Sequence, residues 1–275
     1  MISKGTTLCI SIAKYPSNFG TTLFNAAFKA LRLNFLYKAF RIEAKDLKKV
    51  IDGIGALGIR GCGVSMPFKK EAIKYLDSLD EVAREIGAVN TIINNNGHLK
   101  GYNTDYYGAI EILRKVRGVS EKKVLMLGAG GVASAIASAL KHKKVRGVTI
   151  SNRSRQNGIL FAKRWGFQFI PWQERNNSKT DLLINATPVG MAPDSSQSPI
   201  KEESIANFKI IMDVVINPLE SKLIKLARHK KKEVIPGYKM SLFQAAKQFE
   251  LYTKRKAPIK IMEQSLKKLL SRSYA

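Results

Sequence analysis

The sequence predicts an α/β protein of two domains, each built on a mostly parallel β-sheet that helices cover. Three observations predict this fold class. Short apolar runs alternate with helical patterns along the first hundred residues, and a second alternating segment opens with a glycine-rich turn at 128–131. From Met240 to the end the pattern is helical alone. Such alternation is typical of parallel sheets covered by helices, and 275 residues suffice for two cores.

The N-terminal segment alternates strands and helices and then closes with a hairpin. Its apolar runs predict strands at 7–12, 35–40 and 61–64. Periodic apolar residues predict helices at 22–31, at 44–57 and after Pro67. The hairpin is predicted from the runs 89–93 and 99–102 and from the turn 94–97 between them.

A helix at 107–116 leads into the second α/β segment. Its strands are predicted at 124–127, 148–151, 182–185, 210–215 and 233–235. The C-terminal helices carry an apolar face made of Leu242, Ala245, Ala246 and Phe249. We expect them to pack back on the first domain. The predicted domains are therefore 1–105 with 240–275, and a Rossmann-type domain at 106–239, with a cleft between them.

The composition is strongly basic, with 47 Lys and Arg against 21 Asp and Glu and a formal charge of +26. Such an excess can attract nucleic acid. The basic residues are spread along the chain, however, without a recognition-helix motif or an interleaved aromatic stripe. We therefore expect a solvated basic surface that draws an anionic cofactor and a small anionic substrate, rather than a nucleic-acid site.

No segment of the sequence is long and apolar enough for a membrane span, and Lys14 interrupts the N-terminal apolar run too early for a secretion signal. We expect a cytoplasmic protein, a monomer or a homodimer, in which Cys9 and Cys62 are buried free thiols. The three histidines are scattered in polar contexts, so no metal site is predicted.

A glycine-rich turn stands between the apolar run 124–127 and a helical pattern. Residues 128–133 (GAGGVA) fit G-x-G-x-x-A in the strand, turn and helix context of dinucleotide binding. The first glycine permits the tight turn, the second lets the backbone reach a pyrophosphate, and the alanine allows close packing of the helix. The predicted contacts with the cofactor are Gly128, Ala129, Gly130, Gly131 and Val132. A tight turn without a ligand is the alternative interpretation.

The end of the next strand carries Asn152, Arg153 and Arg155, where a dinucleotide fold recognises the ribose. An acidic residue there would repel a 2′-phosphate, whereas an arginine offers it a cationic fork. We therefore predict NADP rather than NAD as the cofactor. Two exposed arginines on a basic surface are the alternative.

Three polar clusters, 65–69, 89–91 and 103–105, lie at the ends of predicted strands. Open α/β sheets bind their ligands at such strand ends. Interconversion of an alcohol and a ketone needs one group that exchanges the hydroxyl proton and others that hold the carbon in place. Lys69 and Asp105 suit these roles. Taken singly, a surface lysine and a helix-capping aspartate explain them as well.

Together these clusters resemble the shikimate dehydrogenase family, in the same order along nearly the whole chain. Residues 63–69 (GVSMPFK) are similar to the family's N-V-T-x-P-x-K, and AVNT at 88–91 and NTD at 103–105 match its next segments. Further matches follow in order at 128–133, 152–154, 185–187, 213–215 and Gln244.

The resemblance implies reversible hydride transfer between NADP and a ring hydroxyl of shikimate, within the pathway to the aromatic amino acids. It implies that Lys69 and Asp105 are the catalytic pair, and which of them is the base stays open. The substrate-binding residues implied are Ser65, Asn90 and Gln244, together with Asp105. The cofactor site would be completed by Thr187, Val215, Gly237 and Met240, with Met240 near the nicotinamide.

The segment that holds the substrate carboxylate in the family is altered in this chain. Aligned on Asn25, the chain has Asn18 and Gly20 where the family has two serines. Replacement hydroxyls are available from Ser17, Thr21 or Thr22. Loss of a donor to a buried carboxylate costs about 1.5 to 3 kcal/mol, so binding of shikimate should be weakened.

Two further positions depart from the family, because Gly63 replaces an asparagine and Ile216 replaces a tyrosine. The segments PSNFG at 16–20 and GCGVSMPFK at 61–69 resemble a shikimate dehydrogenase-like subgroup. We expect weak activity on shikimate, with quinate or aminoshikimate as alternative substrates. A non-catalytic protein that binds NADP or associates with nucleic acid is the second hypothesis. The altered carboxylate site favours it, and the intact catalytic set argues against it.

Overall fold

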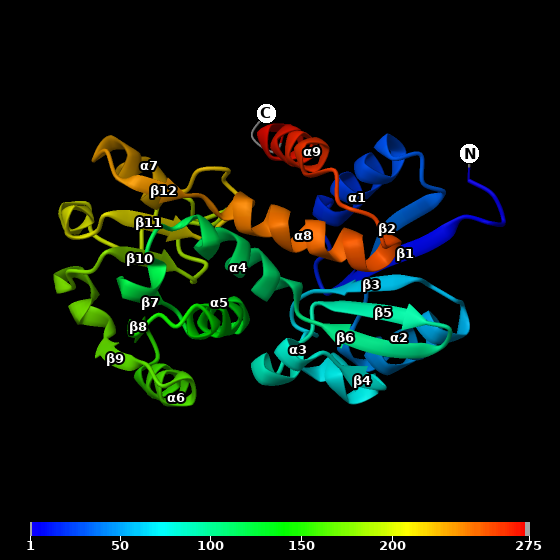
Figure 1. Ribbon diagram of the computed structural model, residues 1–275, viewed down its shortest axis with the longest axis horizontal. Coiled ribbons are helices and arrows are strands. Elements are labelled where there is room, and N and C mark those ends of the chain that lie inside the picture. Colours follow the sequence, from blue (N-terminus) through cyan, green and yellow to red (C-terminus); the bar gives the residue numbers. More distant parts are fainter. Residues whose placement is uncertain (1, 273–275) are drawn as a thin grey trace. The chain divides into compact units, whose positions relative to one another are not determined.

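The computed structural model describes residues 2–272, and the chain divides into two compact α/β units (Figure 1). The first unit takes the chain up to Tyr107 and again from Leu242 onward, and the second takes Gly108–Ser241. The boundaries fall inside helices α4 (Thr104–Lys115) and α8 (Gly237–Thr253). Each unit is built on one six-stranded sheet, and this confirms the predicted fold class.

The sheet of the first unit is mixed and has the order β2-β1-β3-β5-β6-β4. Its strands are β1 (Thr7–Ala13), β2 (Phe35–Arg41), β3 (Gly61–Val64), β4 (Ser78–Leu79), β5 (Thr91–Asn95) and β6 (His98–Tyr102). β1 pairs in parallel with β2 and β3, whereas the hairpin strand β5 runs antiparallel to both β3 and β6. The register places Gly63 of β3 between Ser11 of β1 and Thr91 of β5.

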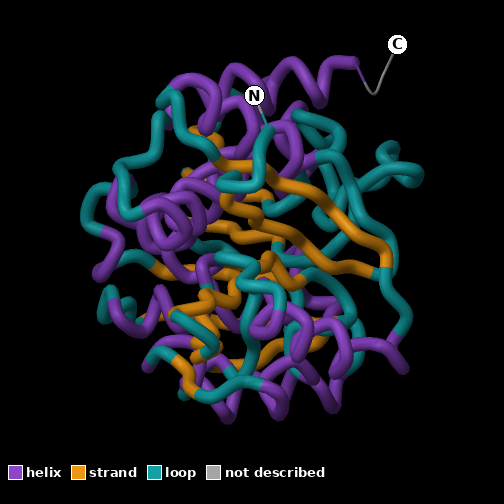
Figure 2. Tube along the Cα trace, turned by 90° about the vertical axis from the view of Figure 1, so that its right-hand side faces the viewer, coloured by secondary structure: helices purple, strands orange, loops and turns teal. Residues whose placement is uncertain are grey.

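Helices of the first unit cover this sheet. They are α1 (Phe19–Ala30), α2 (Leu47–Ala56), α3 (Glu81–Ile86) and α9 (Ile259–Arg272), with 3-10 turns at Ala44–Asp46 and Glu71–Tyr75. α9 packs along α1 (Figure 1), and in Figure 2 it is the helix next to the C-terminal marker. The apolar face predicted for the C-terminal helices is buried in this unit at Leu242, Ala245, Ala246 and Phe249.

The sheet of the second unit is parallel throughout. Its strands are β7 (Lys123–Leu127), β8 (Gly147–Asn152), β9 (Gln168–Pro171), β10 (Leu182–Asn185), β11 (Ile210–Asp213) and β12 (Glu233–Ile235). The order β12-β11-β10-β7-β8-β9 puts the first strand, β7, between β8 and β10. This is the strand order of dinucleotide-binding sheets, which bind their ligand where the winding reverses, here between β7 and β10.

The remaining elements of the second unit are helical. They are α5 (Gly131–His142), α6 (Arg155–Trp165) and α7 (Lys222–His229), with 3-10 turns at Val119–Glu121, Trp172–Asn177 and Glu203–Asn207. The core on one face of the sheet is made by buried strand residues such as Leu125, Leu183 and Ile211, together with Leu223 and Ile224 of α7. Burial of these side chains fixes the strand ends that carry the polar residues described below.

Four of the elements differ from the sequence expectations. The helix expected at 107–116 begins at Thr104, because the Thr104 amide bonds to a side chain of the neighbouring strand segment. The helix expected after Pro67 is only the 3-10 turn at Glu71–Tyr75. The short edge strands β4 and β9 were not predicted, because neither contains a fully buried residue that would give an apolar pattern.

Cys9 and Cys62 are free and fully buried, as predicted. Burial raises the pKa of the Cys9 thiol to about 12 and raises that of Cys62 as well. Within residues 2–272 there is no helix with the length and apolar character that a bilayer crossing requires. The same residues contain no group of His, Cys, Asp and Glu side chains arranged to hold a metal ion.

Candidate active site

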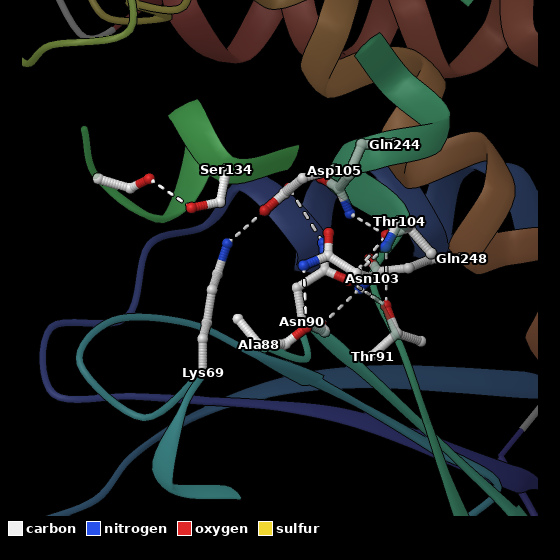
Figure 3. A network of polar contacts seen from close by, with 11 residues as sticks. Lys69, Ala88, Asn90, Thr91, Asn103, Thr104, Asp105, Ser134, Gln244 and Gln248 are labelled. Atoms are coloured by element: carbon white, nitrogen blue, oxygen red, sulfur yellow. Dashed lines mark hydrogen bonds and ion pairs between the residues drawn. The ribbon is translucent and has the colours of Figure 1, made fainter. Parts of the chain in front are cut away.

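A lysine ammonium and an aspartate carboxylate meet in the first unit. Lys69 Nζ lies 2.6 Å from Asp105 Oδ2, and the two side chains are 21% and 14% exposed. Lys69 follows β3 just after the cis peptide Met66-Pro67, and Asp105 stands in the first turn of α4. Figure 3 shows the two side chains pointing toward one another. The residues that the sequence singled out as a pair are in direct contact.

The second oxygen of this carboxylate is also occupied. Asn90 Nδ2 donates to Asp105 Oδ1 over 3.0 Å. A carboxylate that accepts from a cation and from an amide is held in one orientation. Asp105 uses one of the three N–H donors of Lys69, so the ammonium keeps donors for a ligand oxygen.

The orientation of Asn90 is fixed by the threonines around it. Its Oδ1 accepts from the Thr104 amide at 2.7 Å, from Thr91 Oγ1 at 2.9 Å and from Thr104 Oγ1 at 3.1 Å. All three residues are buried. With its oxygen committed to these donors, the Asn90 amide nitrogen must face Asp105. The network therefore fixes the orientation of the Asp105 carboxylate (Figure 3).

Two glutamines of α8 complete the network. Gln244 Nε2 donates to Thr104 Oγ1 at 3.1 Å. One helical turn later, Gln248 Nε2 donates to Thr91 Oγ1 at 2.7 Å and to the Asn90 carbonyl at 3.1 Å. Residues four apart lie on one face of a helix, so the spacing from Gln244 was the signal that could have identified Gln248 in the sequence.

The pair lines a cavity of about 160 Å³ in the first unit, together with Asn90, Gln244 and Gln248. Six residues predicted from the sequence line it: Ser17, Ser65, Lys69, Asn90, Asp105 and Gln244. The predicted Thr21 is not among its lining residues. Sequence reasoning missed other polar lining residues, namely Ser11, Tyr15, Tyr37 and Gln248. Ser11 and Tyr37 lie within strands, where the sequence indicates only core positions.

The glycine-rich turn of the second unit has the geometry that its sequence requires. Gly128 has φ +104°, a conformation that side chains rarely adopt, and a Cβ there would lie 2.8 Å from the Ala186 carbonyl oxygen. A Cβ at Gly130 or Gly131 would meet no atom within 4 Å. Gly130 is the N-cap of α5 and offers no side-chain cap, so the N–H groups of the first turn remain for an anionic ligand.

The residues predicted to recognise the ribose follow β8 at the next strand end. Arg153 and Arg155 are exposed, and Ser154 caps α6 by accepting from the Asn157 amide. Asn152 Nδ2 donates to the Ser154 carbonyl at 2.8 Å. This bond fixes the turn that presents both guanidinium groups to solvent.

A buried aspartate joins the ends of β10 and β11. Asp213 Oδ1 accepts from Asn185 Nδ2 at 2.9 Å and from the Val215 amide at 3.0 Å, and Oδ2 accepts from Ser221 Oγ at 2.5 Å. Asn185 Oδ1 in turn accepts from Thr187 Oγ1 at 2.6 Å. Burial raises the pKa of Asp213 to about 6, and these hydrogen bonds oppose the shift. The network positions two residues predicted to contact the cofactor, Thr187 and Val215.

Gly237 begins α8 in close contact with the backbone after β11. A Cβ at Gly237 would lie 2.3 Å from the Val215 carbonyl oxygen and 2.5 Å from the Val214 carbonyl carbon. Only glycine fits at this position, so close packing against the backbone explains why residue 237 is a glycine. Met240 lies one turn further on and is 5% exposed.

Comparisons with known proteins agree along the length of the chain. Residues 19–92 match the family model described as the shikimate dehydrogenase substrate binding domain. Residues 111–209 match shikimate / quinate 5-dehydrogenase, and residues 237–267 match the shikimate 5′-dehydrogenase C-terminal domain.

Whole relatives are similar over nearly their full length. The chain is 39% identical to a shikimate dehydrogenase-like protein of Haemophilus influenzae, over 92% of this chain and 93% of that protein. It is 35% identical to a shikimate dehydrogenase (NADP(+)) of Methanosphaera stadtmanae, over 97% and 98% of the two chains.

Solved structures share the fold. The shikimate 5-dehydrogenase-like protein HI0607 superposes with a TM-score of 0.91 at 37% identity, over 97% of this chain and 98% of that one. A shikimate dehydrogenase in complex with NADP+ gives a TM-score of 0.91 at 35% identity, over 98% of each chain.

Proposed function

Because the chain belongs to the shikimate dehydrogenase family, we propose that it is an NADP-dependent oxidoreductase that interconverts a ring hydroxyl of shikimate, or of a close analogue, and the corresponding ketone. The observation that carries this proposal is the contact of Lys69 with Asp105 in a polar cavity, backed by Asn90. A cation beside an acceptor is the chemistry that proton exchange with a carbinol oxygen needs.

In the proposed mechanism, Lys69 exchanges a proton with the reacting oxygen. In the direction of reduction the ammonium donates to the forming alkoxide, and in the direction of oxidation the pair takes up the hydroxyl proton. Asp105 holds the ammonium in position and accepts from a neighbouring ring hydroxyl, while Asn90 and Gln244 orient the ring. The two groups are 2.6 Å apart and act together on the same oxygen.

The second unit fits the proposed cofactor. Gly128 lets the turn approach a pyrophosphate, the first turn of α5 supplies free N–H groups, and Arg153 with Arg155 suits a 2′-phosphate. When bound, NADP accepts a hydride from the carbinol carbon or returns it to the carbonyl carbon. Thr187, Val215, Gly237 and Met240 would complete this site.

The function is tested by mixing purified protein with shikimate and NADP+ and following the formation of reduced nicotinamide. We expect turnover at a low kcat/KM for shikimate, because the carboxylate-binding segment is altered, and a lower kcat/KM with NAD+ than with NADP+. Quinate and aminoshikimate are assayed in parallel as alternative substrates. If none of the three acids reduces NADP+, the proposal is wrong.

Three expectations from the sequence remain proposals. A cytoplasmic location agrees with the use of NADP and with the buried free thiols Cys9 and Cys62. A monomeric or homodimeric state is checked by light scattering. Weak nucleic-acid affinity is checked by retention on immobilised DNA at increasing salt.

A further inference from the structure

The charge of the first-unit cavity limits how it can hold an acidic substrate. Among the residues that line it, Lys69 is the only lysine or arginine. Its ammonium is already paired with the Asp105 carboxylate, 2.6 Å away. A carboxylate elsewhere on the ring of the substrate must therefore be met by neutral O–H or N–H donors. The candidates for these donors are the polar lining residues that are outside the catalytic network.

Gln248 is not available for this purpose. A side-chain amide has two N–H donors, and those of Gln248 bond to the Asn90 carbonyl and to Thr91 Oγ1. The hydroxyls of Ser11 and Tyr37 stand beside it, around Gly63. A Cβ on Gly63 would lie 2.9 Å from the Tyr37 hydroxyl oxygen, 3.2 Å from Ser11 Cβ and 3.6 Å from Gln248 Nε2.

Tyr37 is held rigidly at the wall of the cavity. The backbone amide of Tyr37 donates to Asn25 Oδ1 over 2.8 Å, and Asn25 Nδ2 donates to the backbone carbonyl of Tyr37 over 3.0 Å. Phe24 stacks on its ring, with centroids 4.5 Å apart. The side chain is nearly enclosed, with the residue 3% exposed, yet it lines the cavity. Burial raises the pKa of Tyr37 far above its usual value, so the phenol stays neutral and remains a donor.

The phenol also occupies the space beside two glycines. A Cβ on Gly20 would lie 2.7 Å from Tyr37 Cε1 and 3.0 Å from its hydroxyl oxygen, and Gly63 has the similar clash given above. Gly20 and Gly63 are two of the positions at which the sequence departs from its family. One side chain, that of Tyr37, explains why both must be glycine.

We infer that Tyr37 is the specificity-determining residue of this cavity and that its hydroxyl donates a hydrogen bond to the carboxylate of the substrate. Ser11 lies beside it at the same wall of the cavity, because both side chains surround Gly63. The inference rests on the proposed function for the identity of the substrate. It adds which group replaces the altered carboxylate-binding segment.

The decisive variant is Tyr37→Phe, which removes one oxygen and keeps the ring. A hydrogen bond to a charged group is worth about 1.5 to 3 kcal/mol, so the KM for shikimate should rise about ten- to hundredfold. The KM for NADP+ should not change. For shikimate methyl ester, which lacks the negative charge, the same substitution should raise the KM less than about threefold. An unchanged KM for shikimate, or an equal rise for the ester, overturns the inference.

Binding separates this inference from the proposed function. Calorimetric titration of shikimate into the wild type and Tyr37→Phe proteins needs no turnover. If neither protein reduces NADP+ but the wild type binds shikimate at least tenfold more tightly, the inference stands and the dehydrogenase proposal fails. If the wild type turns over shikimate and Tyr37→Phe matches it in affinity, the dehydrogenase proposal stands and the inference fails. Absence of shikimate binding to the wild type overturns the inference.

A steric variant tests the packing without any substrate. Gly20→Ala places a methyl group against the phenol, whereas Gly53→Ala, in helix α2, meets no atom within 4 Å. Alanine is the better helix former, so Gly53→Ala should keep or raise the melting temperature. Gly20→Ala should lower it and weaken shikimate binding. If the two variants behave alike in both measurements, Tyr37 does not occupy the inferred position.

Discussion

Lys69 and Asp105 are 36 residues apart in sequence, yet Nζ of the lysine lies 2.6 Å from Oδ2 of the aspartate. One follows strand β3 and the other opens helix α4, and both belong to the same compact unit. The contact therefore does not depend on any arrangement of the second unit. Substitutions at the pair should change chemistry without changing cofactor affinity.

Replacement of Lys69 by alanine should lower kcat by at least about a hundredfold, because a positioned acid or base contributes about 10² to 10⁴. The Kd for NADP+, measured by fluorescence titration, should stay the same. The adjacent exposed lysine supplies the control, since Lys70→Ala removes an equal charge next to the site. Turnover of Lys69→Ala within tenfold of the wild type would exclude a catalytic role.

Replacement of Arg153 by alanine should raise the KM for NADP+ about tenfold or more and leave the KM for NAD+ nearly unchanged. The reason is that NAD+ lacks the 2′-phosphate that the guanidinium would bind. Lys163→Ala, an exposed cation in the last turn of α6, controls for the loss of one positive charge. Equal effects of Arg153→Ala on both cofactors would contradict the assignment.

Replacement of Gly237 by alanine should destabilise the protein by about 1 to 3 kcal/mol, the usual cost of overpacking. Its methyl group would have to fit 2.3 Å from the Val215 carbonyl oxygen, so the backbone after β11 must move. Urea unfolding measures the loss, and a rise in the Kd for NADP+ should accompany it. A stability equal to that of the wild type would show that the contact is relaxed in solution.

The sequence alone was sufficient for the fold class and for the contact of Lys69 with Asp105, because motifs and strand ends carry that information. It was insufficient where a role depends on a neighbour far along the chain. Tyr37 lies in a strand and looks like a core residue until Gly20 and Gly63 are seen beside it. The early start of α4 was likewise hidden, because Asn90, 14 residues earlier, accepts from the Thr104 amide.

The stability of the protein should depend on pH through Asp213. Its pKa is raised by burial from 3.8 to about 6 in the folded protein. The folded state therefore holds the proton more tightly, and the contribution of this group is fully present below about pH 4 and lost as the pH rises through about 6. Because one pKa unit corresponds to about 1.36 kcal/mol, the change amounts to about 2 to 3 kcal/mol.

Asp213→Asn isolates this effect. Asparagine can accept from Asn185 and Val215 through its oxygen and donate to Ser221 Oγ through its nitrogen. The free energy of unfolding of the variant should increase relative to that of the wild type between about pH 4 and 6. Above this range the difference between the two proteins should stay constant. Asp52→Asn, which removes an exposed carboxylate, controls for net charge. A constant difference across this range would argue against a titrating Asp213.

The position of Asp105 in the first turn of α4 gives its carboxylate a second source of positive potential, the aligned peptide dipoles of that helix. In the proposed mechanism, this field supports the carboxylate while Lys69 donates its proton to the reacting oxygen. The carboxylate keeps its orientation toward Lys69, because Asn90 Nδ2 donates to its other oxygen. Each catalytic cycle can therefore start again without a rearrangement of the side chains.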